Sequence, residues 1–260
     1  MTLLTVAADQ DAHPLEPVRA TVLGLSQGAP LVTLGSDDTD ARWYPASWLA
    51  DPDGPVLAGV LDVAARRWGL GQHAAAAIAF KGYAWTATLP VVAGLLQHRR
   101  VPMLESTDLR VGIADRLPYV RFDLKGVQVA VLPSDPGTRG HSGTVVVPDD
   151  DALLAAARAA ILDGHLAEAV AAMHAATRVG TRLLWGSVAE AVAFAALLMP
   201  ATNAAHVARE LMDALGDPVA GLVEVRDEPD GPAIRRRTCC LWFTGEAGRN
   251  EYCSTCCVPH

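Results

Sequence analysis

Cysteine is absent from the first 238 residues of this 260-residue chain, and all five cysteines lie in the last 22 residues. Thiols that only fill a hydrophobic core would be scattered among the apolar segments. The cysteine-free body therefore disfavours incidental buried thiols and points to one shared ligand for the cysteine segment. In a reducing compartment, clustered thiols are expected to bind metal or to carry out redox chemistry, because structural disulfides are rare there.

Aromatic residues and positive charge are also scarce. Aromatic side chains make up 5% of the residues, while apolar residues make up 51% and alanine is abundant, so we expect a core built mainly from packed helices. Acidic residues outnumber basic ones by 29 to 21, which gives a net charge of −8. This charge disfavours a nucleic acid or an anionic membrane as the main partner.

A secretory signal and a clean membrane span are missing as well. Residues 1–10 lack the basic start and the long apolar stretch of a signal peptide. The most apolar region, residues 73–97, is interrupted by Lys81, Gly82 and Pro90, whereas a span needs about 20 uninterrupted apolar residues. We expect no integral membrane span and a cytoplasmic protein, with a peripheral position at the inner face of the membrane as the alternative.

Hydrophobic periodicity predicts an α+β fold that is mostly helical, with a small antiparallel sheet and a C-terminal cysteine-rich tail. Helical segments are predicted at residues 56–68, 73–98 (one kinked helix or two, because of Pro90), 152–163, 166–178, 182–199 and 205–215. Short strands are predicted at residues 18–25, 31–34, 109–114, 119–122, 127–132, 144–147 and 222–225. We expect a body over residues 1–232, either single or divided into subdomains of about 1–148 and 149–232, followed by the segment 233–260.

The spacing of the cysteines bears on which metal they bind. The tail contains the adjacent pair Cys239-Cys240 and, after residues 241–252, the run Cys253-x-x-Cys256-Cys257. A CxxC pair can chelate a single zinc ion. Adjacent side chains of an extended segment point to opposite faces, so two neighbouring thiolates rarely reach one tetrahedral ion. A [2Fe–2S] cluster accepts four thiolates at more varied positions and is therefore favoured, with zinc and a disulfide-forming redox tail as alternatives.

The segment Arg236-Arg237-Thr238-Cys239-Cys240-Leu241-Trp242-Phe243, followed by Cys253-x-x-Cys256, resembles the C-terminal motif of FhuF-type ferric siderophore reductases. The segment 182–186, Arg-Leu-Leu-Trp-Gly, resembles part of the helical body of that family. The resemblance implies that Cys239, Cys240, Cys253 and Cys256 ligate a [2Fe–2S] cluster. This chain departs from the family in a longer spacer and in a fifth cysteine, Cys257, which is the alternative fourth ligand.

The resemblance also implies an activity, the one-electron reduction of Fe(III) in a siderophore complex with release of Fe(II) in the cytoplasm. Hydroxamate oxygens hold Fe(III) far more tightly than Fe(II), so an added electron releases the metal. The net charge of −8 favours hydroxamate over anionic catecholate complexes. Since the chain lacks a Gly-rich dinucleotide fingerprint, we expect electrons from a separate donor such as a ferredoxin or an NAD(P)H-dependent reductase. The alternatives are a zinc-binding structural or assembly protein, and a [2Fe–2S] electron carrier without a siderophore substrate.

A few further residues are candidates for contact with substrate or donor. No catalytic side chain is predicted beyond the redox cluster. Arg235, Arg236 and Arg237 are either an ordinary solvated charge run or a basic patch that docks an acidic donor. Lys81 and Tyr83, within an apolar helical stretch, and Trp185 either pack in the core or line a substrate pocket.

Overall fold

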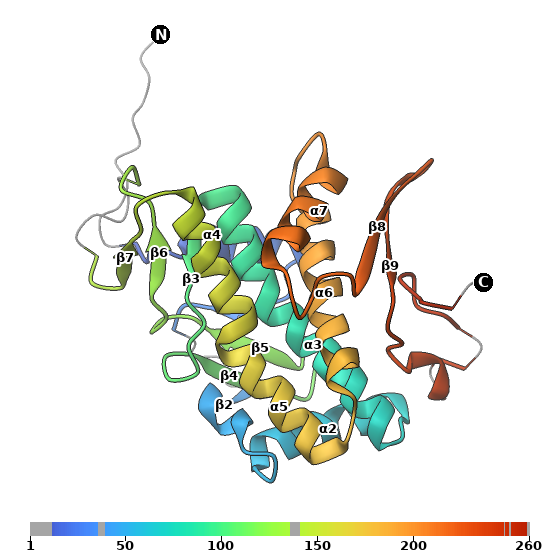
Figure 1. Cartoon of the computed structure of the whole chain (residues 1–260). Helices are drawn as coiled ribbons and strands as arrows, with labels where there is room; N and C mark the ends of the chain where they lie inside the picture. The colour runs from blue at the N-terminus through green and yellow to red at the C-terminus, as the bar shows by residue number, and fades with distance from the viewer. Residues whose placement is uncertain (1–11, 36–39, 136–140, 247, 250, 259–260) are drawn as a thin grey trace.

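The computed structural model describes residues 12–35, 40–135, 141–246, 248–249 and 251–258 (Figure 1). Two long helices, α3 (Gln72–Ala93) and α6 (Thr181–Leu198), pack against each other at the centre of the molecule. Around them lie α1 (Glu16–Leu25), α2 (Pro55–Trp68), α4 (Asp150–Arg158), α5 (His165–Thr177) and α7 (Ala204–Leu215). Short helical turns are η1 (Ala46–Ala50), η2 (Gly94–His98), η4 (Ala159–Asp163) and η5 (Trp242–Thr244).

Helix α3 is the central core helix. Seventeen of its 22 residues are buried, as expected for a helix that is apolar on all sides. It continues through Pro90 and ends in the π-helical turn η2. Of the two predicted alternatives, one helix or two, the structure therefore confirms one. Among the described residues, α6 is the one helix that is long and apolar enough to cross a membrane, and 61% of that window is buried inside the protein.

The strands form two small sheets and a separate hairpin. The first sheet has the order β1-β5-β4-β2 and the second the order β3-β6-β7. Their strands are β1 (Val32–Thr33), β2 (Ala41–Pro45), β3 (Arg100–Pro102), β4 (Arg110–Ala114), β5 (Val120–Asp123), β6 (Val129–Val131) and β7 (Thr144–Val146). Pairing is mostly antiparallel, as predicted, but β1 runs parallel to β5 and β6 parallel to β7. The α+β class is therefore confirmed, with two sheets in place of one.

One predicted strand is wrong, because residues 18–25 belong to α1. Val18 and Val22 are buried four residues apart, which is the spacing of one helix face. On the more exposed side of α1, Arg19 pairs with Glu16 across one helical turn at 2.5 Å. This helical period outweighs the β-branched residues that made the segment resemble a strand.

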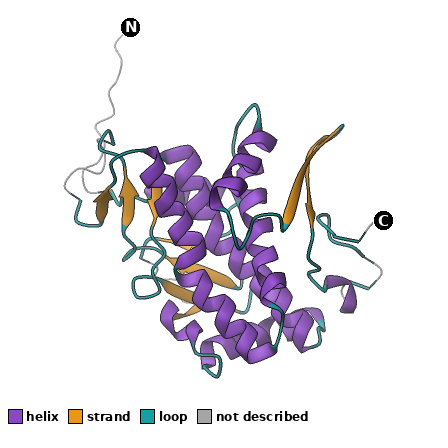
Figure 2. Cartoon of the chain, in the orientation of Figure 1, coloured by secondary structure: helices purple, strands orange, loops and turns teal. Residues whose placement is uncertain are grey.

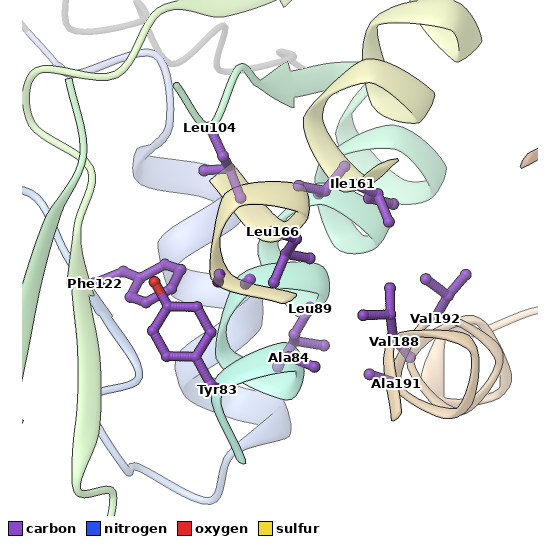
Figure 3. Close-up of a cluster of buried hydrophobic side chains, with 14 of the residues drawn as sticks. Tyr83, Ala84, Leu89, Leu104, Phe122, Ile161, Leu166, Val188, Ala191 and Val192 are labelled. Atoms are coloured by element: carbon purple, nitrogen blue, oxygen red, sulfur yellow. The ribbon is translucent and has the colours of Figure 1, made fainter. Parts of the chain in front are cut away.

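A continuous hydrophobic core joins the N-terminal and C-terminal parts of the described chain. It extends from Leu15, before α1, to Cys240 in the tail. Figure 3 shows the centre of this core, where Tyr83 and Leu89 of α3 meet Phe122 of β5, Leu166 of α5 and Val188 of α6. The helices and the first sheet are therefore packed around the same buried side chains.

The final strands form an antiparallel hairpin, β8 (Val223–Glu228) and β9 (Gly231–Arg236), that lies beside α6 and α7 (Figure 2). The predicted strand at residues 222–225 corresponds to β8 and is confirmed. Its partner β9 was not predicted, because residues 227–232 contain a turn and the arginines that follow resembled a solvated charge run. The hairpin matters for the tail because β9 delivers the chain directly to the first cysteines.

Candidate metal centre

The first cysteine segment lies directly against helix α6. Strand β9 leads into Thr238 and Cys240, which are buried, with the half-buried Cys239 between them. Gly186 of α6 makes this approach possible, since a Cβ atom at that position would collide with the Thr238 hydroxyl. The missing side chain therefore lets the cysteine segment reach the helix backbone.

The loop between the two cysteine segments is anchored on the connection between α2 and α3. Trp242, in η5, lies edge-to-face against Trp68, with ring centroids 6.2 Å apart. Gly245 contacts Leu70 and Gly248 contacts the Trp242 backbone so closely that a Cβ atom at either glycine would collide. The loop thereby returns toward β9, and Cys253 lies beside Cys240.

One thiol from each cysteine segment faces the other. The Sγ atoms of Cys240 and Cys253 are 3.6 Å apart. Two thiolates on one tetrahedral metal, with metal–sulfur bonds of about 2.3 Å, lie about 3.8 Å apart. This pair combines one thiol from each segment and has the spacing that a shared metal requires.

Cys256 is the most enclosed cysteine of the second segment. It is buried, and its sulfur accepts a hydrogen bond from the Val258 amide at 3.4 Å. Burial raises the pKa of Cys257, and the neighbouring Cys239 and Cys256 sulfurs raise it further. All five cysteines are free thiols. Within the described part of the chain, no three His, Cys, Asp or Glu side chains surround a point where one metal ion would bind.

The two closest thiols have very different acidity. A hydrogen bond from Cys240 lowers the pKa of Cys253 to about 5, partly opposed by burial, and the charge of Lys81 and the Thr255 hydroxyl lower it further. The same hydrogen bond, together with burial, raises the pKa of Cys240. These contacts favour the thiolate form of Cys253, and the thiolate is the protonation state that binds metal.

Behind the cysteines lies a buried ionic network centred on Glu190 of α6. Arg236 Nη1 donates to Glu190 Oε2 at 2.9 Å, and Lys81 Nζ donates to Glu190 Oε1 at 2.9 Å. The Arg236 guanidinium is enclosed and also donates to the hydroxyls of Ser187 and Thr238, each at 3.2 Å. Arg236 therefore joins α6 to the first cysteine segment.

The second cysteine segment is attached to the same network through Thr255. The Thr255 hydroxyl donates to Glu190 Oε1, and the Thr255 carbonyl accepts a hydrogen bond from the Arg236 amide at 2.9 Å. Glu190 and Arg236 together hold both cysteine segments on α6. We call Glu190, Arg236, Thr255 and Ser187 together the Glu190 network.

The three arginines that were predicted to dock an electron donor differ in their exposure to solvent. Arg237 is exposed and Arg235 is half-buried, whereas Arg236 is only 1% exposed. The docking interpretation is wrong for Arg236, because its guanidinium is enclosed and paired with Glu190. Arg235 and Arg237 remain accessible on the hairpin and the residue that follows it.

The other three candidate residues have different positions. Tyr83 is 1% exposed and its hydroxyl is hydrogen-bonded to His165, so the pocket interpretation is wrong for Tyr83. Trp185 is half-buried and packs against the core. Lys81 lies next to the cysteine tail, paired with Glu190.

Glu190, Ser187 and Thr255 were missed by the sequence interpretation. A signal existed for Glu190, since a carboxylate within the apolar helical run 182–199 needs a partner when it is buried. The identity of that partner was not readable, because Arg236 reaches Glu190 only through the unpredicted strand β9.

One family of known proteins matches the chain. The model of the family described as “Ferric iron reductase FhuF-like transporter” matches residues 80–233. This match covers more than half of the chain, from α3 into β9, and ends before Cys239. No curated protein matches the chain. The family match and the cysteine motif involve different residues and lead to the same assignment, and the chain belongs to the FhuF-like family of ferric iron reductases.

Proposed function

We propose that this protein reduces Fe(III) in a siderophore complex of the hydroxamate type by one electron and releases Fe(II) in the cytoplasm. A [2Fe–2S] cluster, held by Cys239, Cys240, Cys253 and Cys256 with Cys257 as the alternative fourth ligand, would store and pass on that electron. The family assignment supports ferric iron reduction. The observation that carries the cluster proposal is the Cys240–Cys253 pair, whose 3.6 Å spacing matches two ligands of one metal.

Residues around the cysteines also support a metal centre, because they fix the two cysteine segments in place and shield one sulfur from water. The Glu190 network holds both cysteine segments through contacts between protein groups. Trp242 anchors the loop on Trp68, and burial of Cys240 keeps that sulfur away from bulk water. Exclusion of water and hydrogen bonds to the sulfurs are the properties through which proteins set the potential of an iron–sulfur centre.

The electron donor is proposed to be a separate protein, a ferredoxin or an NAD(P)H-dependent reductase. The accessible Arg235 and Arg237 offer positive charge beside the cysteines in a chain whose net charge is −8. Opposite charge at a docking surface raises the rate of encounter.

Metal analysis of anaerobically purified protein tests the cluster. We expect two iron and two sulfide per chain, visible absorption, and an EPR signal after reduction. Colourless protein with one zinc per chain would overturn the cluster assignment. Mixing the reduced protein with ferric hydroxamate complexes tests the activity. We expect rapid reoxidation with Fe(II) captured by a ferrous chelator, and protein that stays reduced would contradict the reductase proposal.

A further inference from the structure

A pocket of about 220 Å³ lies between α3, α6 and the second cysteine segment. Trp85 of α3 and Phe194 of α6 form one wall, with ring centroids 5.6 Å apart. Ser254 and Thr255, which follow Cys253 directly, form the opposite wall. The pocket is therefore shared between the helical body and the cysteine segment.

Both charged residues that line the pocket are engaged in ion pairs, and Glu190 also pairs with the buried Arg236 behind it. Lys81 and Glu190 both line the pocket, and they are paired at 2.9 Å. The other lining groups are two aromatic rings, small side chains and hydroxyls. Such a lining favours a ligand that is uncharged, with aliphatic surface for the rings and carbonyl or amide groups for the hydroxyls.

Phe194 is unusual for a residue of a core helix. It is 45% exposed, although α6 is otherwise largely buried. A large apolar side chain held open at a pocket rim, beside a second aromatic ring, is a feature of binding sites for partly apolar ligands. Helix α6 presents Phe194 one turn beyond Glu190, on the same side as the cysteine tail.

We propose that this pocket binds the aliphatic backbone of an uncharged ferric chelate and places its iron beside the Cys253–Thr255 segment, an inference that rests on the proposed reductase function. Pockets that enclose a whole small-molecule ligand usually have about 300–1,000 Å³. This pocket is smaller at about 220 Å³, so it takes one part of the chelate and leaves the iron at the mouth. Ser254 and Thr255 of the second cysteine segment line the pocket, so the iron would lie beside the segment from which an electron would leave the protein.

Binding of a redox-inert gallium(III) trihydroxamate complex tests the pocket without any electron transfer. The holoprotein is titrated with this complex by calorimetry, as wild type and as the variants Phe194→Ala and Trp85→Leu. We expect each variant to bind about tenfold more weakly, because an aromatic contact with the ligand is lost. Trp48→Leu is the matched control, since Trp48 is an exposed aromatic residue (51%) outside the pocket, and it should bind like wild type.

The outcomes separate the pocket from the proposed function. Unchanged gallium-complex affinity in Phe194→Ala and Trp85→Leu, with wild-type reduction of ferric hydroxamates, would overturn the pocket and leave the reductase function intact. A wild-type protein that neither binds the gallium complex nor reduces the ferric one would overturn both. If Trp85→Leu loses its visible spectrum, Phe194→Ala decides alone, because the exposed Phe194 can be truncated without opening the core.

Discussion

His165, at the start of α5, is the most strongly perturbed histidine of the described chain. It is 1% exposed, lies against Tyr83 and Phe122, and burial lowers its pKa from 6.5 to about 4. The folded protein therefore binds fewer protons than the unfolded chain between these two pH values. The stability that a neutral His165 provides is complete above pH 6.5 and is lost as the pH falls toward about 4.

Replacing His165 by glutamine, which does not titrate, should flatten this pH dependence. Between pH 7 and pH 4 the wild type should lose roughly 3 kcal/mol more of its free energy of unfolding than His165→Gln loses, at 1.36 kcal/mol per pKa unit. Urea unfolding at several pH values measures this difference. His206→Gln, at an exposed histidine of α7, is the control and should keep the wild-type slope. Parallel curves for wild type and His165→Gln would contradict the assignment.

The fourth ligand of the proposed cluster can be identified by replacing single cysteines. The CxxC spacing favours Cys256, whereas the structure brings the Cys257 thiol next to Cys239. We expect Cys256→Ser to lose the visible absorption and the iron, and Cys257→Ser to keep both. Cys253→Ser is the reference for complete loss. The reverse result, iron retained in Cys256→Ser and lost in Cys257→Ser, would transfer the ligand role to Cys257.

At the scale of elements, the Glu190 network connects α6, β9 and both cysteine segments. Arg236 is fully buried, so removal of its partner leaves an uncompensated charge in the interior. Glu190→Ala should therefore lower the free energy of unfolding by about 3–5 kcal/mol, the usual cost of breaking a buried pair.

Glu210→Ala is the matched control for this substitution. Glu210 also lies on a helix and pairs with a neighbouring basic side chain, His206, at 3.2 Å, but both side chains are exposed. Its removal should cost about 0.5 kcal/mol or less. Urea unfolding measures both variants, and similar small losses would mean that the Glu190 network does not hold the tail.

The helices and strands that could be predicted from the sequence are those in which buried apolar residues recur at the regular spacing of a helix or a strand. Helix α2 ends at Trp68 with Gly69 in the left-handed conformation, as its position in the sequence suggested. Strands β4 to β7 were also recognisable. The strand β9 was missed because the half-buried Arg235 alternates with the inward-facing, buried Arg236. An inward arginine cannot be recognised from the sequence without its partner. The cysteine positions were readable, but the residues that hold them, Gly186 and Glu190, depend on contacts distant in sequence.

For the molecule as a whole, net charge is negative while the accessible Arg235 and Arg237 lie beside the cysteines. The double variant Arg235→Gln/Arg237→Gln should slow reduction by an acidic donor severalfold at low salt and flatten its dependence on ionic strength. Stopped-flow kinetics over a range of salt concentrations measures this effect.

The variant Arg99→Gln/Arg178→Gln is the control for total charge. Both arginines are exposed at the ends of other elements, so the same two charges are removed away from the cysteine tail. If the two double variants show the same kinetics, net charge matters and a localised docking surface is excluded.

The close approach of Cys240 and Cys253 has a consequence for the protein before metal is inserted. A thiolate and a thiol held 3.6 Å apart are poised for oxidation, since peroxide attacked by the thiolate gives a sulfenic acid that the second thiol converts to a disulfide and water. Metal-free protein treated with hydrogen peroxide should therefore form a Cys240–Cys253 crosslink, visible by peptide mass spectrometry, and should regain iron only after treatment with a reductant. Random crosslinks among the five cysteines would contradict this. The geometry that suits the metal thus also makes the metal-free protein sensitive to peroxide. Cluster insertion and thiol oxidation therefore compete for the same pair of sulfur atoms.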